Sequence, residues 1–128
     1  GSCITFDLLE GGGIYRGGNI APGIAMRLRA MHAFTARLPA VPVDAGDTGW
    51  LGDTTESAMR RGAQLGAALE IEGYIALCSA QIGRINVILT GGDADFLAKK
   101  LKSKIFVNHH LVLMGLNKIL NYNVEGLE

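Results

Sequence analysis

Glycine is the feature that most constrains this chain. Eighteen glycines against three prolines divide its 128 residues into short apolar segments, with glycine runs at 11–13, 17–18 and 91–92. Glycine adopts backbone conformations and close approaches that other residues resist, so these runs predict tight turns and closely packed backbones. Neither a collagen period nor a low-complexity tract accompanies them. The pattern indicates a turn-rich globular domain.

Composition narrows the class further. Hydrophobic residues make up 48% and charged residues 19%, which excludes intrinsic disorder and suits one domain with a filled core. Lys and Arg total 12, as do Asp and Glu, and a net charge of zero argues against a nucleic-acid partner. No apolar run approaches the ~20 residues of a membrane span, and no signal peptide is recognisable. Cys3 and Cys78 lack metal or CxxC spacing, so we expect reduced thiols in a cytoplasmic protein.

The first third of the chain predicts strands followed by a helix. The β-rich run 3–9, a turn at 10–13, a segment at 14–15 and another at 19–21 indicate a three-stranded antiparallel meander, with Gly17-Gly18 as its second turn. Pro22 suits a first helical position. Apolar residues then follow at helical spacing, and the helix must end before Pro39.

The middle of the chain predicts an ordered loop over 39–51 and then a long helix. Asp53 and Glu56 have the spacing of a capping box, and the helix continues to about Ile82, where Gly83 ends it. Three glycines fall near one face of this helix, and each costs about 1 kcal/mol there. We expect that another backbone, from a neighbouring helix or a second subunit, packs against Gly62, Gly66 and Gly73.

The last third alternates strands and helices. A buried strand is expected over 85–90, and Gly91-Gly92 with Asp93 then begins a helix reaching about Leu101. A strand over 105–107 and a helix over 111–120 follow. The predicted order is β-β-β-α-α-β-α-β-α, an α/β domain over residues 1–128.

Two glycine segments could approach a ligand. Gly91-Gly92 lies between a strand and a helix start, where exposed N–H groups favour anions or polar rings. Gly1-Ser2-Cys3-Ile4-Thr5 carries N–H groups and hydroxyls into the first strand. Taken alone, a Gly-Gly pair after a strand is more often only a turn.

Six landmarks in order resemble the second half of a type III pantothenate kinase. They span almost all of the chain, and the second and third are the most specific. They are Gly1-Ser2-x-x-Thr5-x-Asp7, Gly17-Gly18-x-Ile20-x-Pro22-Gly23, Thr35-Ala36-x-Leu38-Pro39, Gly52-x-x-Thr55 with Ala58 and Gly62, Thr90-Gly91-Gly92-Asp93-Ala94, and Leu111-x-Leu113-x-Gly115-Leu116.

This resemblance implies the actin-like, ribonuclease H-like fold of the acetate and sugar kinase, Hsp70 and actin superfamily. Members have two related lobes with ATP between them, and this chain resembles the C-terminal lobe alone. The resemblance implies phosphorylation of pantothenate to 4′-phosphopantothenate by ATP, the first step of coenzyme A biosynthesis. The family's DxGNT phosphate loop and its GxDR segment, whose aspartate is the general base, are absent. We therefore expect no catalytic residue and no metal ligand in this chain, and no activity from it alone.

The family's binding roles transfer by position. Gly1 and Ser2 would contact ATP phosphate, Gly91 and Gly92 would lie beside the adenosine, and Thr55 would hydrogen-bond pantothenate. A cloning remnant is an alternative origin for Gly1-Ser2, which would void that role, and a capping hydroxyl is the alternative for Thr55. The resemblance also implies Mg²⁺, potassium or ammonium as monovalent cation, and a homodimer formed through this lobe. It leaves the role of Asp7 open.

Other residues suggest structural roles. His109-His110 lacks a third ligand at metal spacing, His32 suits a surface, and the lysines of 99–104 suit a solvated face. Trp50 and Phe34 fit either a subunit contact or the core. Two functional alternatives to the kinase remain: an accessory transcription regulator, and a nonenzymatic nucleotide-binding lobe of the same superfamily.

Overall fold

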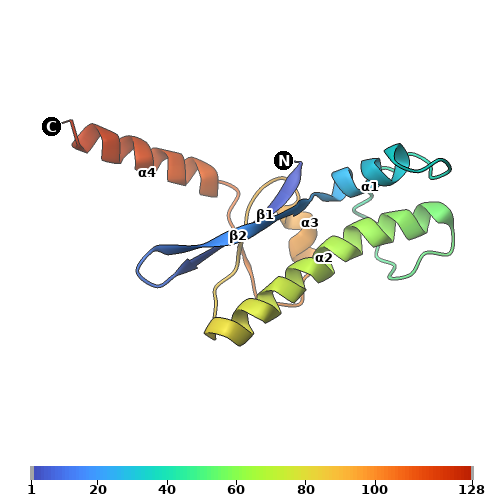
Figure 1. The fold of residues 1–128 in the computed structure, drawn as a ribbon, viewed down its shortest axis with the longest axis horizontal. Coiled ribbons are helices and arrows are strands. Elements are labelled where there is room, and N and C mark those ends of the chain that lie inside the picture. The colour runs from blue at the N-terminus through green and yellow to red at the C-terminus, as the bar shows by residue number, and fades with distance from the viewer. Residues whose placement is uncertain (1, 128) are drawn as a thin grey trace. The chain divides into compact units, whose positions relative to one another are not determined.

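The computed structural model describes residues 2–127 and divides the chain into two compact units, Gly1–Ile71 and Glu72–Glu128. The first unit contains β1 (Cys3–Glu10), β2 (Ile14–Pro22), α1 (Ile24–Ala33) and most of α2 (Thr55–Ile82). The second contains the end of α2, β3 (Ile88–Leu89), α3 (Ala94–Lys100), β4 (Phe106–Val107) and α4 (Leu111–Glu125) (Figure 1). The predicted α/β class and the α-β-α-β-α order from residue 55 onward are confirmed.

The predicted three-stranded meander is instead a two-stranded hairpin. β1 pairs antiparallel with β2 from Cys3↔Pro22 to Glu10↔Ile14, and residues 19–21 continue β2. Gly17 lies inside this strand with φ +105°, opposite an irregularity between Leu8 and Leu9. A glycine with positive φ accommodates such a bulge, so the strand bends where the sequence suggested a turn.

Two glycines allow the backbone of the hairpin to pack closely. A Cβ on Gly18 would overlap the carbonyl oxygen of Phe6, and one on Gly23 would lie 2.5 Å from the carbonyl oxygen of Ser2. Gly23 also donates its N–H to that Ser2 oxygen at 2.8 Å. Pro22 therefore closes β2 and Gly23 is the N-cap of α1, so the helix begins at Ile24, two residues after the predicted first position at Pro22.

α1 ends earlier than its apolar spacing predicts. Thr35 Oγ1 donates to the Met31 carbonyl at 2.6 Å and accepts from the Leu38 N–H at 3.3 Å. A side-chain hydroxyl that bonds nearby backbone groups competes with continued helix. The last helical residue is consequently Ala33 rather than one near Leu38.

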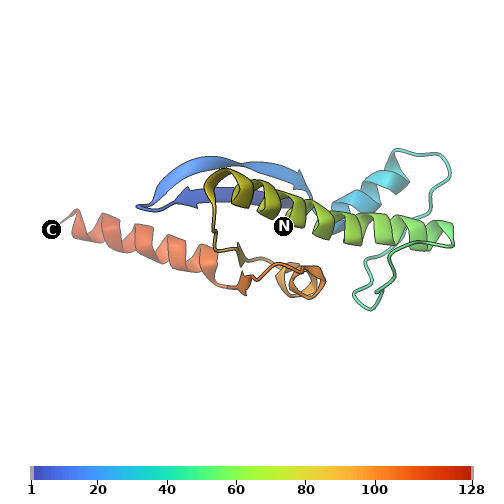
Figure 2. The same ribbon diagram turned by 90° about the horizontal axis from the view of Figure 1, so that it is seen from below.

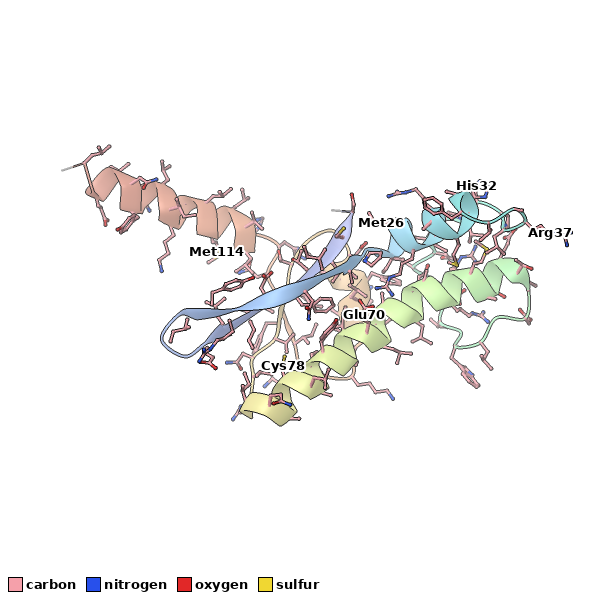
Figure 3. All side chains as sticks on the ribbon, in the orientation of Figure 1. Met26, His32, Arg37, Glu70, Cys78 and Met114 are labelled. Atoms are coloured by element: carbon pink, nitrogen blue, oxygen red, sulfur yellow. The ribbon has the colours of Figure 1, made fainter. Side chains whose placement is uncertain are left out.

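α1 lies beside the N-terminal part of α2 (Figure 2). Buried apolar side chains and one charged pair, Arg27 with Glu70, hold the two helices together. Arg27 donates Nη2 to Glu70 Oε1 at 2.8 Å and Nε to the Pro22 carbonyl at 2.9 Å. Figure 3 shows Glu70 on the side of α2 that faces the start of α1. The buried apolar residues of this unit are Ile24, Leu28, Val41, Met59, Ala63, Ala67, Ala68 and Ile71.

The loop between α1 and α2 is ordered, as predicted, because polar side chains of α2 bind it. Gln64 is 1% exposed; its Nε2 donates to the Asp44 carbonyl at 2.9 Å and its Oε1 accepts from the Asp44 N–H at 2.8 Å. Asp47 accepts from Arg61 Nε at 2.9 Å and from the Gly49 N–H at 3.0 Å. The Arg61 hydrogen bond, followed by that of Gly49, lowers the pKa of Asp47 below its usual value of 3.8.

α2 begins with a capping box one residue after the predicted one. Thr54 Oγ1 accepts from the Ser57 N–H at 3.1 Å, and Ser57 Oγ accepts from the Thr54 N–H at 3.0 Å. The predicted partners Asp53 and Glu56 do not form this reciprocal pair. The other end is as predicted: α2 stops at Ile82, and Gly83 follows with φ +84°.

The second unit is built on two short parallel strands. β3 pairs with β4 through Ile88↔Phe106 and Leu89↔Val107, a smaller extent than the predicted 85–90 and 105–107. Glu72 on α2 accepts hydrogen bonds from Ser103 Oγ and from the N–H groups of Ser103 and Lys102. These bonds, that of the Ser103 hydroxyl foremost, lower the pKa of Glu72 and hold the connection between α3 and β4.

The two remaining helices of this unit differ in burial. α3 begins at Ala94, as predicted, although Asp93 forms no side-chain capping bond. α4 extends to Glu125, past the predicted end at 120, and has no buried residue. Over residues 2–127, none of the helices combines the length and hydropathy that a membrane crossing requires.

Asp47→Asn tests how the loop is held. A carboxylate with a depressed pKa stabilises the fold above its unfolded pKa, and this contribution is lost as pH falls through the folded value. The variant should therefore melt at a lower temperature than the parent at pH 7, and the difference should shrink below about pH 4. Thermal unfolding followed by circular dichroism measures both. Asp93→Asn, which removes no capping bond, is the control, and a pH-independent difference would contradict the prediction.

Candidate nucleotide and substrate site

The carboxyl ends of β3 and β4 lie at one edge of the small sheet. Phe106 N donates to the Val87 carbonyl at 2.8 Å and Asn108 N to the Leu89 carbonyl at 2.9 Å. Because the strands are parallel, the segment 90–93 after β3 and the segment 108–110 after β4 emerge at the same edge. In open α/β sheets, ligands bind at the carboxyl ends of the strands.

The backbone of the described chain requires glycine at position 91 but not at position 92. Gly91 has φ +95°, which strains any other residue, and its carbonyl accepts from the Ala94 N–H at 3.2 Å. Gly92 has no positive φ, and a Cβ built there would meet no atom of the described chain within 4 Å. Both are exposed. Nothing within residues 2–127 accounts for glycine at 92, which fits the close approach of a group from outside the chain.

The chemistry of this turn suits a polar ring better than a phosphate. α3 has only seven residues, and Asp95 places a carboxylate in its first turn. That negative charge opposes binding of an anion at the helix start. The adenosine contact expected for Gly91 and Gly92 is compatible with this arrangement, whereas the Asp95 carboxylate disfavours a phosphate there.

His109 connects the two segments at this edge. Its Nε2 lies 3.1 Å from Asp95 Oδ1, with the two side chains 50% and 69% exposed. A contact this exposed contributes at most about 1 kcal/mol. His109 and His110 lie in the turn before α4, as predicted, and His110 is the N-cap residue. Within the described part of the chain, no three His, Cys, Asp or Glu side chains are grouped as metal ligands.

An open pocket of about 680 Å³ lies on the same sheet, but the glycine turn does not line it. Its polar lining comes from asparagine and histidine side chains, and its apolar lining is exposed strand surface. The lining residues are Asn86, Ile88, Phe106, Val107, Asn108, His109 and His110.

Thr55 lies in the first unit with its hydroxyl unengaged. It is the first residue of α2, it is exposed, and it makes no side-chain hydrogen bond with the described residues. Thr54 performs the capping. The structure thus removes the capping explanation for Thr55, and its hydroxyl is free to bind a ligand.

Gly52, three residues before Thr55, has a structural role. A Cβ there would overlap the backbone of Ala58, so only glycine lets the loop pass so close to the first turn of α2. In the pair Gly52-x-x-Thr55, the glycine shapes the loop and the threonine faces solvent.

Sequence reasoning missed Gln64 and Arg61, which hold this loop. The one sequence signal is that Gln64 is a polar residue between Ala63 and Leu65 of the helix, and Arg61, next to Arg60, carries no such signal.

Ser2 is exposed just before β1, and its hydroxyl makes no hydrogen bond with the described residues. Gly1, the other residue predicted to contact phosphate, lies outside the described residues. Asp7 accepts a hydrogen bond from Tyr15 at 2.9 Å, which raises the pKa of that tyrosine. Ser2 and Thr55 belong to the first unit, and Gly91 and Gly92 belong to the second.

The residues predicted to be structural lie at the surface. His32 is exposed and pairs through Nδ1 with the Leu38 carbonyl at 2.7 Å. Phe34 is 88% exposed and Trp50 75%, so neither is in the core of the described chain. Cys3 and Cys78 are free thiols. Lys99, Lys102 and Lys104 are exposed, as predicted for a solvated face.

Comparison with a family model and comparison with individual known proteins both identify the same family. The family model of type III pantothenate kinase matches residues 1–77. Type III pantothenate kinases of Bacteroides fragilis and Porphyromonas gingivalis are 49% and 45% identical over 96% and 97% of this chain. That of Phocaeicola vulgatus is 44% identical over 96%. The chain spans about half the length of these relatives, 50–52%, and corresponds to their C-terminal half.

A solved structure shares the fold. The crystal structure of a presumed Baf family transcriptional activator from Campylobacter jejuni is 27% identical and superposes with a TM-score of 0.67. The match covers 97% of this chain and 55% of that one. Because the family model matches more than half of the residues and several relatives exceed 40% identity over nearly all of them, this chain belongs to the type III pantothenate kinase family.

Proposed function

We propose that the whole protein, the product of the complete gene, phosphorylates pantothenate with ATP, and that residues 1–128 form its C-terminal, actin-like lobe. Kinship with type III pantothenate kinases over nearly the full chain carries the proposal. The exposed Thr55 hydroxyl and the open position at Gly92 support it, since both lack a role within the described residues. The product would be 4′-phosphopantothenate, made in the cytoplasm for coenzyme A.

In this mechanism the chain binds and orients substrates. Thr55 would bind pantothenate, and Gly91 and Gly92 would let the adenosine approach the backbone. Ser2, with Gly1, would bind an ATP phosphate. Phosphoryl transfer depends mainly on such positioning and on charge stabilisation. The general base would belong to the N-terminal lobe, and the aspartate that binds a monovalent cation would lie two positions before Gly1. Mg²⁺ would be held outside residues 1–128 as well.

The family's homodimer would use the glycine face of α2. A Cβ added at Gly62, Gly66 or Gly73 meets no atom of the described chain within 4 Å, so no neighbouring element of this chain requires those glycines. Leu69 and Leu77 beside them are 61% and 60% exposed. Of the two expected explanations, close packing by a second subunit is the one that the structure supports.

The Campylobacter jejuni protein's description suggests an alternative, a transcription activator that binds DNA. This chain has equal numbers of basic and acidic residues, whereas phosphate neutralisation by excess Lys and Arg supplies much of the affinity for DNA. The curated relatives named above are kinases. We therefore favour the kinase, and binding of promoter DNA by the whole protein at physiological salt would favour the alternative.

The direct experiment measures ADP release by the whole protein with Mg-ATP and potassium. Release should depend on pantothenate, and residues 1–128 alone, the control, should show none because the base is outside them. Absence of pantothenate-dependent release from the whole protein in both potassium and ammonium would refute the kinase. A nonenzymatic nucleotide-binding lobe would then be the better hypothesis for the function.

Thr55→Val and Gly92→Val should affect different substrates. Loss of one hydrogen bond costs about 1 kcal/mol, so Thr55→Val should raise the KM for pantothenate about fivefold and leave that for ATP unchanged. Gly92→Val should raise the KM for ATP alone, without loss of thermal stability, because its side chain meets no part of the described chain. Thr54→Val, which removes the helix cap, should instead lower stability by about 1 kcal/mol. Equal effects of both variants on both substrates would contradict these roles.

Gly66→Leu tests the dimer face. In a monomer the change should stabilise α2 by up to about 1 kcal/mol, because leucine favours helix more than glycine does and has open space here. In a dimer packed on the glycines it should raise the dissociation constant at least about tenfold. Sedimentation of the whole protein measures this. Ser79→Leu, at an exposed position off the glycine face, is the matched control, and an unchanged dimer would exclude this face.

A further inference from the structure

α4 is a fifteen-residue helix without a single buried side chain. Figures 1 and 2 show it running away from β4 in both views. Met114 contacts the turn before the helix, since its Sδ accepts from Asn108 Nδ2 at 3.4 Å. Met114 is 58% exposed. The other large apolar side chains of α4 are similarly exposed: Leu111, Val112, Leu113, Leu116, Ile119, Leu120, Tyr122 and Val124.

These side chains form one continuous surface. At 3.6 residues per turn, the apolar residues of α4 except Met114 occupy an arc of roughly 220°, interrupted only by Asn123. Asn117, Lys118, Asn121 and Glu125 gather on the remaining arc. A helix that packs on one neighbour needs an apolar stripe of only about 100°. The arc of α4 is wide enough to be covered from two sides.

Such a helix is not stable in water by itself. Isolated helices of about 12–15 residues are marginal, and each large apolar side chain contributes about 1.5–3 kcal/mol only when it is buried. α4 therefore requires a cover that residues 2–127 do not supply in this structure.

The relatives indicate which part of the whole protein packs on the apolar side chains of α4. They match this chain over 95–98% of its length, so α4 is part of what is shared, yet they are about twice as long. The homologous fold in the Campylobacter jejuni structure is likewise only 55% of its chain. A second unit of similar size thus accompanies α4 throughout this group. The glycine face of α2, with its small residues, is a separate surface that suits a second copy.

We propose that the apolar arc of α4 docks on the N-terminal half of the whole protein and joins the two lobes. This rests on the proposal that residues 1–128 are the C-terminal lobe. The partner surface would be apolar where it meets Leu116, Ile119 and Leu120, and the arc with Asn117 and Asn121 would stay in solvent. Through this contact α4 would hold one wall of the nucleotide cleft to the other.

Photo-crosslinking of the whole protein tests the docking. A photoreactive amino acid replaces Ile119 on the apolar arc or, as matched control, Asn121 on the polar arc. Position 119 should crosslink to peptides that precede Gly1 within the same molecule, and position 121 should not. Mixing isotope-labelled and unlabelled protein separates intramolecular from intermolecular products. Crosslinks only to a second copy, or only to residues 1–110, would overturn the proposal, as would equal crosslinking from both positions.

Hydrogen exchange gives a second measurement without any substitution in the arc. Amides of 111–125 should exchange about tenfold or more slowly in the whole protein than in residues 1–128 alone. Equal protection in both, or protection of the isolated chain that rises with its concentration, would show that this chain or a second copy covers α4 and would refute the docking. Neither measurement needs enzymatic activity, so an inactive protein with a docked α4 would contradict the kinase proposal and leave this one standing.

Discussion

The buried amide of Gln64 holds the long loop of the first unit against α2, and the candidate substrate site depends on that contact. Gln64 binds both the N–H and the carbonyl of Asp44, and Arg61 and Asp47 continue the attachment toward Gly49. An unpaired buried amide costs about 1–3 kcal/mol, so the loop cannot leave without a penalty. The loop therefore has one backbone conformation where it leads into α2. In that conformation Thr54 caps the helix and Thr55 faces solvent.

The glycines that divide the chain serve three physical purposes. Gly17, Gly83 and Gly91 supply a positive φ. Gly18, Gly23 and Gly52 let two backbones approach where a Cβ would overlap the neighbouring chain. A third group has neither reason within the described residues: Gly11, Gly62, Gly66, Gly73, Gly92 and Gly115. Glycine costs stability in a helix, so Gly62, Gly66 and Gly73 on α2 are the members that the proposed second subunit would explain.

The same reasoning connects the glycines with α4. Within the described residues, the glycines of α2 and the uncovered apolar arc of α4 each cost stability, and the proposed larger assembly would offset both costs. A lobe of a two-lobed kinase meets three partners: its other lobe, its substrates and a second copy. Under the proposals above, α4 would meet the other lobe, Thr55 and Gly92 would meet the substrates, and the glycine face of α2 would meet a second copy.

The sequence by itself determined the family, the long helix 55–82, the turn at 91–92 and the position of α3, because ordered motifs, helical periodicity and glycine are local signals. It placed the second turn of the meander at Gly17-Gly18, where the structure has a bulge inside β2. It also put the capping box one residue early and ended the last helix too soon. Only the tertiary structure decided which glycines are required by close packing, that Gln64 is a buried anchor, and that Thr55 is unengaged. Those properties depend on which distant backbone lies opposite each residue, and no local pattern in a sequence records that distance.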